Sequence, residues 1–316
     1  MILSLDTSCY TTSVALVTTE GDLLADKRRV LDVPLGQRGL AQSEALFQHI
    51  RNIPTLIESL AADFDFGKIK AIGVSSKPRP LENSYMPVFL GGENAARNLA
   101  AALKVPLFRV SHQEGHMAAG LGTVDFSPAI GEKFLMCHFS GGTSEIHQAV
   151  KIKEGEYEFT LIAATNDLHA GQFVDRIGVK LGLKFPTGKE LEKLAAKATG
   201  EIPKLPTYCQ NGEFSFSGQE TAIESMLKKG TTAEVAARCV EETLGRTFKK
   251  ALIYATEKTN AETALMVGGV TANQYVKTYL IEKISHCNLF FTPPKFATDN
   301  AVGVGRLALA RYMAKK

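Results

Sequence analysis

The feature that most constrains the fold is an arrangement of short β-prone segments that occurs twice along the chain. Near the N-terminus, an apolar stretch from Ile2 to Val17 is interrupted by the polar step Asp6-Thr7-Ser8-Cys9, and a turn and a third strand follow. The arrangement starts again at Phe134–Phe139, which ends in Ser140-Gly141-Gly142-Thr143-Ser144 before a second strand from Glu145 to Val150. Apolar segments bounded by turn residues predict strands. We therefore expect two related β-meanders, which form a weak internal repeat.

Helices alternate with strands after each meander. The periodicity predicts helices at 42–62, 93–103 and 301–313, and strands at 69–75, 105–110, 263–267 and 288–292. Such alternation is typical of an α/β fold with a largely parallel sheet. A chain of 316 residues suits two domains. We expect an N-terminal lobe of residues 1–110 plus 300–316 and a C-terminal lobe of residues 111–299, packed together with the functional site between them.

Composition excludes several classes of protein. No apolar run approaches the roughly 20 residues that span a bilayer, so no membrane association is expected. The start of the chain lacks the basic region of a signal peptide. The five cysteines are scattered and form no C-x-x-C pair, which argues against a disulfide framework or a structural zinc site. The cytoplasm is the expected location. A net charge of +3 is too small to indicate nucleic-acid binding.

A pair of histidines at His112 and His116 is the clearest candidate for a metal site. The segment follows a predicted strand and should open a helix, with Ser111 as the N-cap. Histidines four residues apart lie about 40° apart around a helix axis, so both imidazoles can reach one ion. The alternative is that the two histidines only cap a helix.

The pair differs from the zinc-protease pattern H-E-x-x-H in the position of its glutamate. In that pattern the glutamate follows the first histidine directly and can reach a metal-bound water. Here Glu114 lies two residues after His112, about 180° around the axis from the midpoint of the pair. We therefore expect Glu114 to point away from the metal face, which counts against peptidase chemistry.

The best candidate for a third metal ligand lies in Thr298-Asp299-Asn300, which follows one predicted strand and precedes the last predicted helix. A threonine or aspartate before a helix is also an ordinary N-cap. From local sequence alone, the capping interpretation of Asp299 is the stronger of the two.

Two glycine steps predict a phosphate or nucleotide site. Ser140-Gly141-Gly142-Thr143 joins two strands, and Gly268-Gly269-Val270-Thr271-Ala272-Asn273 leads from a strand into a helix. Backbone amides freed by glycine, together with a helix N-terminus, favour bound phosphate. Asp175, on a predicted helix, would suit ribose hydroxyls, or it pairs with a nearby cation in solvent. Walker and G-x-G-x-x-G elements are absent from the sequence, which excludes the corresponding nucleotide folds.

Taken in order, these residues resemble the TsaD family, formerly called O-sialoglycoprotein endopeptidases. The resemblance runs from Leu3 to the C-terminal helix. Seven motifs carry it, and each is weak alone. They are Asp6-Thr7-Ser8-Cys9, His112-x-Glu114-Gly115-His116, Ser140-Gly141-Gly142, Phe173-x-Asp175-Arg176 with Leu181-Gly182-Leu183, Phe214-Ser215-Phe216-Ser217-Gly218, Gly268-Gly269-Val270-x-Ala272-Asn273, and Pro294-x-Phe296-x-Thr298-Asp299-Asn300.

The resemblance implies an actin/Hsp70-like fold of two RNase H-like lobes with a nucleotide and metal cleft between them. It implies transfer of a threonylcarbamoyl group from threonylcarbamoyl-AMP to the exocyclic amine of the adenosine beside the anticodon in tRNA. His112, His116 and Asp299 would hold a divalent metal, iron or zinc. An adenine nucleotide, threonylcarbamoyl-AMP or ATP, would be held by Phe139, Ser140, Gly141, Gly142, Thr143, Asp175, Gly188, Glu192 and Asn273. The expected partners are tRNA and proteins of the threonylcarbamoylation system or a paralogue.

The sequence departs from the family's usual pattern near the expected reaction centre. Asp-Glu after the first cysteine is replaced by Tyr10-Thr11, and a glycine-rich Ala-Gly-Pro-Gly segment is replaced by residues 77–83. The histidine of Ser-Gly-Gly-His-Thr is Thr143, and a Gly-Glu pair is Gly171-Gln172. Two alternatives to the tRNA-modifying enzyme therefore remain open: a carbamoyl-type transferase with another acceptor, and a non-catalytic nucleotide-binding protein that acts as a scaffold for an active relative.

Overall fold

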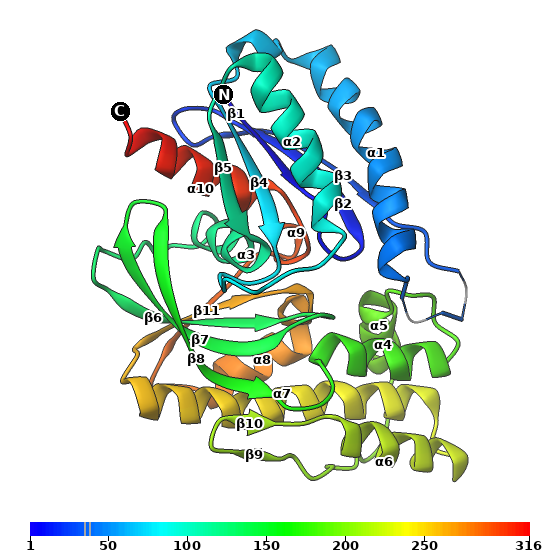
Figure 1. Ribbon diagram of the computed structural model, residues 1–316. Coiled ribbons are helices and arrows are strands. Elements are labelled where there is room, and N and C mark those ends of the chain that lie inside the picture. The colour runs from blue at the N-terminus through cyan, green and yellow to red at the C-terminus, as the bar shows by residue number, and fades with distance from the viewer. Residues whose placement is uncertain (35, 38) are drawn as a thin grey trace.

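The first of two β-sheets is built from the N-terminal part of the chain. The structure, a computed structural model, describes residues 1–34, 36–37 and 39–316 (Figure 1). The strand order in this sheet is β3-β2-β1-β4-β5. Strands β1, β2 and β3 form an antiparallel meander, and β4 and β5 continue the sheet parallel to β1. Their bounds are β1 Ile2–Asp6, β2 Thr11–Val17, β3 Leu23–Val30, β4 Ala71–Lys77 and β5 Leu107–Ser111.

The second sheet repeats this arrangement, as the sequence predicts. Its strand order is β12-β11-β6-β7-β8-β10-β9. Strands β6, β7 and β8 form an antiparallel meander, and β11 and β12 extend the sheet in parallel on the other side of β6. The bounds are β6 Lys133–Phe139, β7 Ser144–Lys153, β8 Glu156–Thr165, β9 Cys209–Gln210, β10 Glu213–Phe214, β11 Thr263–Val267 and β12 Asn288–Phe291.

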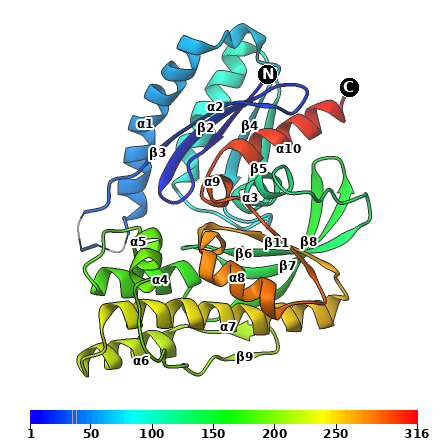
Figure 2. The ribbon, with the colours of Figure 1, turned by 180° about the vertical axis from the view of Figure 1, so that it is seen from behind.

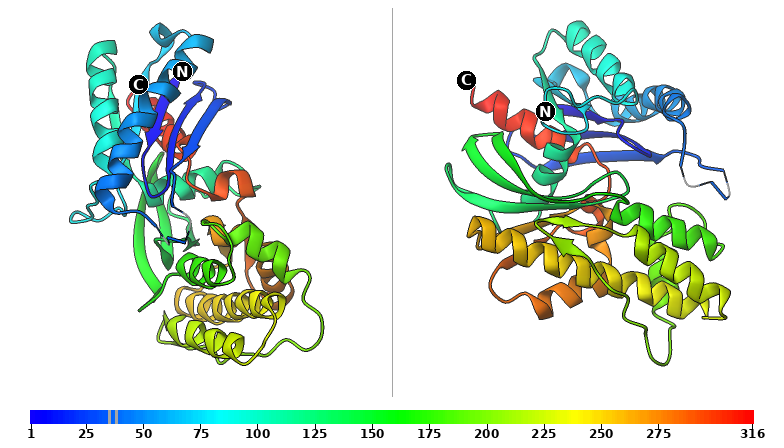
Figure 3. Two further views of the ribbon diagram at one scale, coloured as in Figure 1. Left: turned by 90° about the vertical axis from the view of Figure 1, so that its right-hand side faces the viewer. Right: turned by 60° about the horizontal axis from the view of Figure 1, so that its bottom comes forward.

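Helices cover the faces of both sheets and separate them. In Figure 1, α1 and α2 lie in front of the first sheet, and in Figure 2 α10 lies in front of its other face. The left view of Figure 3 shows the second sheet, with α7 and its neighbouring helices on the side that faces away from the first sheet. The helices are α1 Gln42–Asp63, α2 Phe89–Leu103, α3 His112–Leu121, α4 Ala170–Lys180, α5 Gly188–Ala195, α6 Ser217–Lys228, α7 Ala233–Thr259, α8 Gln274–Lys283, α9 Pro294–Ala297 and α10 Val302–Met313, with short 3₁₀ turns η1 Phe66–Lys68 and η2 Gly269–Ala272.

The C-terminal helix α10 returns to the first sheet and packs on β1, β2 and β4. Hydrogen bonds fix its start to that sheet: the Oγ of Ser4 donates to the carbonyl of Ala301 at 2.7 Å, and the N–H of Ala301 donates to the Oγ of Ser13 at 2.9 Å. This placement agrees with assigning residues 300–316 to the N-terminal lobe. The exact domain boundaries stay a prediction.

Helix α2 begins four residues earlier than the periodicity predicts, at Phe89 instead of Glu93. Gly91 and Gly92 have low helix propensity, so local sequence places the start after them. In the structure, the Oγ1 of Thr7 donates to the carbonyl of Val88 at 2.9 Å and accepts the N–H of Gly92 at 3.1 Å. A contact from the end of β1 thus stabilises the extra turn.

No helix in the described part of the chain is both long and apolar enough to cross a bilayer.

Glycines allow α3 and α10 to approach each other closely. A Cβ built on Gly303 would overlap the carbonyl oxygen of Gly115, and a Cβ on Gly115 would lie 3.2 Å from the side chain of Val304. Because interiors are close-packed, neither backbone has room to move aside without disturbing the sheets on either side.

We therefore predict that Gly303→Ala destabilises the protein by about 1–3 kcal/mol through overpacking. The measurement is the free energy of unfolding in urea. Gly218→Ala is the matched control, since a Cβ at Gly218 meets no heavy atom within 4 Å among the described residues. Equal stability of Gly303→Ala and the wild type would contradict the prediction.

Candidate metal and nucleotide site

Helix α3 begins where the sequence predicts. The Oγ of Ser111 accepts the N–H of Glu114 at 3.2 Å, and the carboxylate of Glu114 accepts the N–H of Ser111 at 2.7 Å. This reciprocal pair is a capping box, which satisfies two backbone donors that a helix start leaves unpaired. The cap confirms Ser111 in its predicted role and fixes His112 as the first residue of the helix.

The carboxylate of Glu114 is engaged away from the histidine pair. One of its oxygens receives the capping hydrogen bonds, and the other accepts from Nη2 of Arg311 on α10 at 2.9 Å. Both oxygens therefore have partners on the side of α3 that faces Ser111 and α10. The predicted direction of Glu114 is confirmed, and Glu114 is not positioned as the general base of a peptidase.

His112, His116 and Asp299 converge on one point. The Nε2 atoms of the two histidines are 3.1 Å apart, and they lie 3.5 and 3.4 Å, respectively, from Oδ1 of Asp299. One ligand atom from each residue lies within 4.8 Å of the other two. Two imidazoles and a carboxylate suit both iron and zinc. The structure thus brings together the candidate histidine pair and the candidate Asp299, which lie more than 180 positions apart in the sequence.

Asn300, and not Asp299, caps helix α10. The Oδ1 of Asn300 accepts the N–H groups of Val302 and Gly303 at 3.1 and 3.4 Å. The carbonyl of Asp299 accepts from Nη1 of Arg28 on β3 at 3.3 Å. The carboxylate of Asp299 is therefore not needed for capping and faces the two histidines. The capping alternative for Asp299 is wrong, because its neighbour has the geometry for that role.

Asp6, at the end of β1, orients His112. The Nδ1–H of His112 donates to Oδ2 of Asp6 at 2.8 Å, which leaves Nε2 directed at Asp299 and His116. Burial opposes a charge on His112, but the negative charge of Asp6 and the hydrogen bond to Asp299 raise the pKa of His112 to about 10. Burial also raises the pKa of Asp299, but hydrogen bonds from the two histidines outweigh it and hold that pKa far below its ordinary value. The sequence signalled Asp6 only as part of a polar step.

A third histidine, His138 on β6, borders the cluster. Its ring centroid lies 4.6 Å from that of His116, and the residue is 1% exposed. Burial and the neighbouring histidines lower the pKa of His138 well below its ordinary value. Neither ring nitrogen of His138, nor Nδ1 of His116, has a hydrogen-bond partner among the described residues. Buried polar atoms are rarely left unpaired, so these orphaned nitrogens fit a site that holds an ion and its bound water.

We predict that Asp6→Asn weakens divalent-metal binding about 10- to 100-fold, since it removes the carboxylate that orients His112, one of the candidate metal ligands. The measurement is the dissociation constant for Zn²⁺ by competition with a chromogenic chelator. Asp22→Asn, at an exposed turn, is the matched control and should bind as the wild type does. Unchanged affinity in a folded Asp6→Asn protein would contradict the role given to Asp6.

The predicted nucleotide-binding turn joins β6 to β7. The N–H of Ser140 donates to the carbonyl of Thr143 at 2.7 Å, and the Oγ of Ser140 accepts the N–H of Thr143 at 3.1 Å. The start of α4 packs directly on this turn, because the N–H of Gly171 donates to the carbonyl of Ser140 at 3.0 Å. A Cβ on Gly171 would overlap the backbone of Gly141. The residues Phe139 to Thr143 are thus held in one tight turn at the start of α4.

The other predicted nucleotide ligands lie on α4, α5 and the start of α8. Asp175 on α4 accepts the N–H of Thr187 at 2.7 Å, so it fixes the turn before Gly188 opens α5. Glu192 on α5 accepts the N–H of Gln274 at 2.7 Å, which ties α5 to α8. Their binding of an adenine nucleotide stays a prediction.

Asn273 caps α8 by accepting the N–H of Val276 at 2.9 Å. Its amide also donates to Oε1 of Glu241 on α7 at 2.7 Å. With Gln274 bonded to Glu192, the N-terminus of α8 is anchored to both α5 and α7. Asn273 and Glu192 therefore both contact the N-terminus of α8, as joint binding of one nucleotide would require.

A polar cluster of three buried residues and the partly exposed Arg79 lies beside the histidines and was not predicted. It consists of Arg79, Gln113, Glu145 and His147, and we call it the Glu145 cluster. Arg79 forms an ion pair with Glu145 at 2.5 Å, and Gln113 and His147 each donate to Oε2 of Glu145, at 3.2 and 2.9 Å. Burial raises the pKa of Glu145, but the hydrogen bond from His147 and the charge of Arg79 outweigh it and lower this pKa to about 2.

The low pKa of Glu145 gives a pH-dependent contribution to stability. A carboxyl group whose pKa is lower in the folded chain stabilises the fold above its ordinary pKa of 4.5, and this contribution is lost as the pH falls toward 2. We predict that the free energy of unfolding falls by roughly 3 kcal/mol more over this window in the wild type than in Glu145→Gln. Urea unfolding at several pH values measures the difference, with Glu158→Gln on the exposed face of β8 as the control. Parallel pH profiles for the wild type and Glu145→Gln would contradict it.

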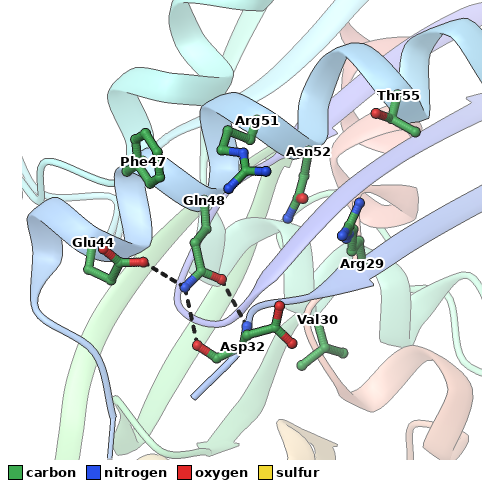
Figure 4. A pocket seen from close by; sticks show the side chains of 9 residues that line it. All are labelled: Arg29, Val30, Asp32, Glu44, Phe47, Gln48, Arg51, Asn52 and Thr55. Atoms are coloured by element: carbon green, nitrogen blue, oxygen red, sulfur yellow. Dashed lines mark hydrogen bonds between the residues drawn. The ribbon is translucent and has the colours of Figure 1, made fainter. Parts of the chain in front are cut away.

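A separate cavity of about 310 Å³ lies between the end of β3 and α1 (Figure 4). Gln48 crosses it, donating to Glu44 at 2.9 Å and accepting the N–H of Asp32 at 2.8 Å. Arg29 and Arg51 also line it. None of the predicted metal or nucleotide ligands is among its lining residues.

Comparisons with known proteins decide the family. The family described as "TsaD: tRNA N6-adenosine threonylcarbamoyltransferase" matches residues 35–305. The chain belongs to the TsaD family. A protein named tRNA N6-adenosine threonylcarbamoyltransferase from Neorickettsia sennetsu is 29% identical over 99% of this chain and 94% of its own length. One of the same name from Ligilactobacillus salivarius is 31% identical over 100% of this chain and 92% of its own length.

Solved structures show the fold. HypF from T. kodakarensis superposes with a TM-score of 0.63 at 13% identity, covering 99% of this chain and 48% of that protein. An activator of 2-hydroxyisocaproyl-CoA dehydratase from Clostridium difficile with bound ADPNP gives a TM-score of 0.56 at 11% identity, covering 99% of this chain and 95% of that one. The predicted two-lobed actin/Hsp70-like α/β fold is confirmed.

Proposed function

We propose that this TsaD-family chain transfers the threonylcarbamoyl group of threonylcarbamoyl-AMP to the exocyclic amine of the adenosine beside the anticodon in tRNA. The convergence of His112, His116 and Asp299 carries the proposal, because it preserves a complete ligand set in a chain that matches threonylcarbamoyltransferases over nearly its whole length. Its expected partners are tRNA and other proteins of the threonylcarbamoylation system, in the cytoplasm.

The chemistry is an acyl transfer at a carbamoyl carbon. The amine nitrogen forms a bond to this carbon, the bond from the carbon to the phosphate oxygen breaks, AMP leaves, and the amine releases one proton. When bound, iron or zinc on His112, His116 and Asp299 would act as a Lewis acid that orients the carbamoyl carbonyl and offsets the charge of the departing AMP. We assign no residue as the general base.

The chain's own residues hold this arrangement in place. Asp6 fixes the tautomer of His112 by accepting its Nδ1–H, which leaves the Nε2 lone pair free for a ligand. The turn from Phe139 to Thr143 would place backbone amides near the phosphate. Asp175, Gly188, Glu192 and Asn273 would hold the remainder of the adenylate, as the family resemblance implies.

One observation favours an alternative acceptor, or a non-catalytic paralogue that supports an active relative. Two of the departures from the family pattern, at Tyr10 and at Arg79, make contacts between the two predicted lobes. The ring of Tyr10, after β1, lies 5.1 Å from that of Phe185, before α5. Arg79, after β4, pairs with Glu145 on β7. These contacts place larger side chains with fixed partners at positions where the family usually has acidic residues or glycines.

The decisive experiment supplies the purified protein with iron or zinc, threonylcarbamoyl-AMP and unmodified tRNA, and analyses the nucleosides by mass spectrometry. We expect threonylcarbamoyladenosine, and we expect His116→Ala to reduce its formation to background because a metal ligand is lost. An active family member serves as the positive control.

The other outcomes separate the alternatives. Consumption of threonylcarbamoyl-AMP that does not depend on tRNA would indicate a different acceptor. Nucleotide binding without turnover, together with stable co-purification with an active relative, would indicate a scaffold. Either result would overturn the proposed function.

A further inference from the structure

Arg79 lies on a segment that is fixed against the start of α3. Residues 78–88 connect β4 to α2 and cross below α3 toward the second sheet (Figure 1). The carbonyl of Pro78 accepts the N–H of Gln113 at 3.1 Å, and the N–H of Arg79 donates to the Oγ of Ser84 at 3.0 Å. Gln113 directly follows His112 in the sequence. The backbone of Arg79 is thereby tied to the helix that carries the histidine pair.

The guanidinium of Arg79 is held by one edge only. Its Nη2 lies 2.5 Å from Oε1 of Glu145, and its Nε donates to Oε2 at 3.3 Å. This two-point pairing orients the planar group. Within the part of the chain that the structure describes, Nη1 makes no hydrogen bond, and the side chain of Arg79 is 36% exposed while that of Glu145 is 10% exposed. A fixed edge and a free edge are what a recognition arginine needs.

The other residues of the Glu145 cluster keep the carboxylate of Glu145 in position for Arg79. His147 and Gln113 both donate to the carboxylate of Glu145 and are themselves buried. Removing a carboxylate and its partners from water costs free energy, and an ion pair of this kind is weak evidence for a purely stabilising role. The cluster lies next to the candidate metal site, and this position supports a functional role instead. Glu145 lies opposite His138 in the pairing of β6 with β7.

Arg79 is connected to elements that carry both halves of the proposed site. On one side is α3 with its histidines, reached through Gln113. On the other is the start of α4, which is tied to β7 because the N–H of Ala170 donates to the Oγ of Ser144 at 2.8 Å. The charge of Arg79 acts on His169, at the N-cap of α4. Arg79 is thus linked to the helix that carries the histidine pair and, through Glu145, to the strand that follows the nucleotide-binding turn.

Other arginines near the metal ligands have no free edge. Arg28 uses Nε and Nη2 on Asp26, and its Nη1 on Thr298 and the carbonyl of Asp299. Arg311 donates to two backbone carbonyls and to Glu114. Among these described arginines, Arg79 alone retains an unused guanidinium nitrogen.

We infer that Arg79 binds the carboxylate of the threonine moiety in the donor adenylate. This inference rests on the proposed function. The metal ligands would hold the carbamoyl carbonyl and the glycine turn the phosphate, which leaves the carboxylate as the anionic group without a partner. The planar guanidinium matches a carboxylate in shape and charge. Arg79 stands in the segment where the family usually has glycines, so this contact is a property of this chain.

The test compares three nucleotides by calorimetry on the metal-loaded protein: threonylcarbamoyl-AMP, the carbamoyl adenylate made from 1-aminopropan-2-ol, which lacks only the carboxylate, and AMP. We expect the wild type to prefer threonylcarbamoyl-AMP over the decarboxylated analogue by about 10-fold or more, as for a hydrogen bond between charged groups. Arg79→Gln should abolish this preference and leave AMP binding unchanged. Arg79→Lys should retain part of it, and Lys77→Gln, which removes a cation at the end of β4 two residues before Arg79, should retain all of it.

Three outcomes overturn the inference. If Arg79→Gln keeps the preference, Arg79 does not bind the carboxylate. If Arg79→Gln weakens AMP as much as threonylcarbamoyl-AMP, the residue binds the phosphate. If the wild type binds threonylcarbamoyl-AMP no better than AMP, the proposed donor is wrong as well. Circular dichroism and thermal unfolding establish that each variant is folded, and the lysine variant provides a reading even if the glutamine variant does not fold.

Discussion

The close approach of α3 and α10 is the constraint on which the candidate site depends. Gly303 lies against the carbonyl of Gly115, which directly precedes His116 on α3. Asp299 comes just before α10, so the distance between the two helices sets the distance between its carboxylate and the imidazoles. Hydrogen bonds from Ser4 and Ser13 then fix the start of α10 to the first sheet. The geometry of the ligands therefore follows from the packing of backbones.

Electrostatics favour the same arrangement. Asp6, His112 and the partly buried Asp299 form a row in which a histidine stands between two carboxylates. Burial of each charge is unfavourable alone, and the pairing offsets that cost. A divalent cation would be held by His112, His116 and Asp299, and its charge would offset the charges of the two carboxylates. The unpaired nitrogens of His116 and His138 lie on the border of this row. The site is thus organised for a positive charge before any ligand binds.

Two of the departures from the family pattern, at Tyr10 and at Arg79, place side chains in contact with the other lobe. Tyr10 and Arg79 both follow strands of the first sheet, and both contact elements of the second lobe. Side chains that link the lobes reduce the freedom of one lobe to move against the other, since their contacts must break for the cleft to open. In Arg79, the same side chain that links the lobes leaves an edge free for an anion. A change in substrate recognition and a change in interlobe contact are therefore coupled in this chain.

By itself, the sequence determined the repeated meanders, the helix start at Ser111, the direction of Glu114 and the pairing of His112 with His116. These are local features, set by side-chain periodicity, capping and the angle per residue of a helix. The family resemblance added two predictions: that Asp299 is a metal ligand, and which residues bind the nucleotide. Only the tertiary structure decided that Asn300 caps α10, that Asp6 orients His112, that Thr7 extends α2, and that Arg79, Gln113 and His147 meet at Glu145. Asn300 lies only two residues before Val302, but local sequence does not distinguish it from Thr298 or Asp299 as the capping side chain. Most of the other residues lie far from their partners in the sequence, and their contacts depend on the register of strands and the packing of two sheets, which no local pattern specifies.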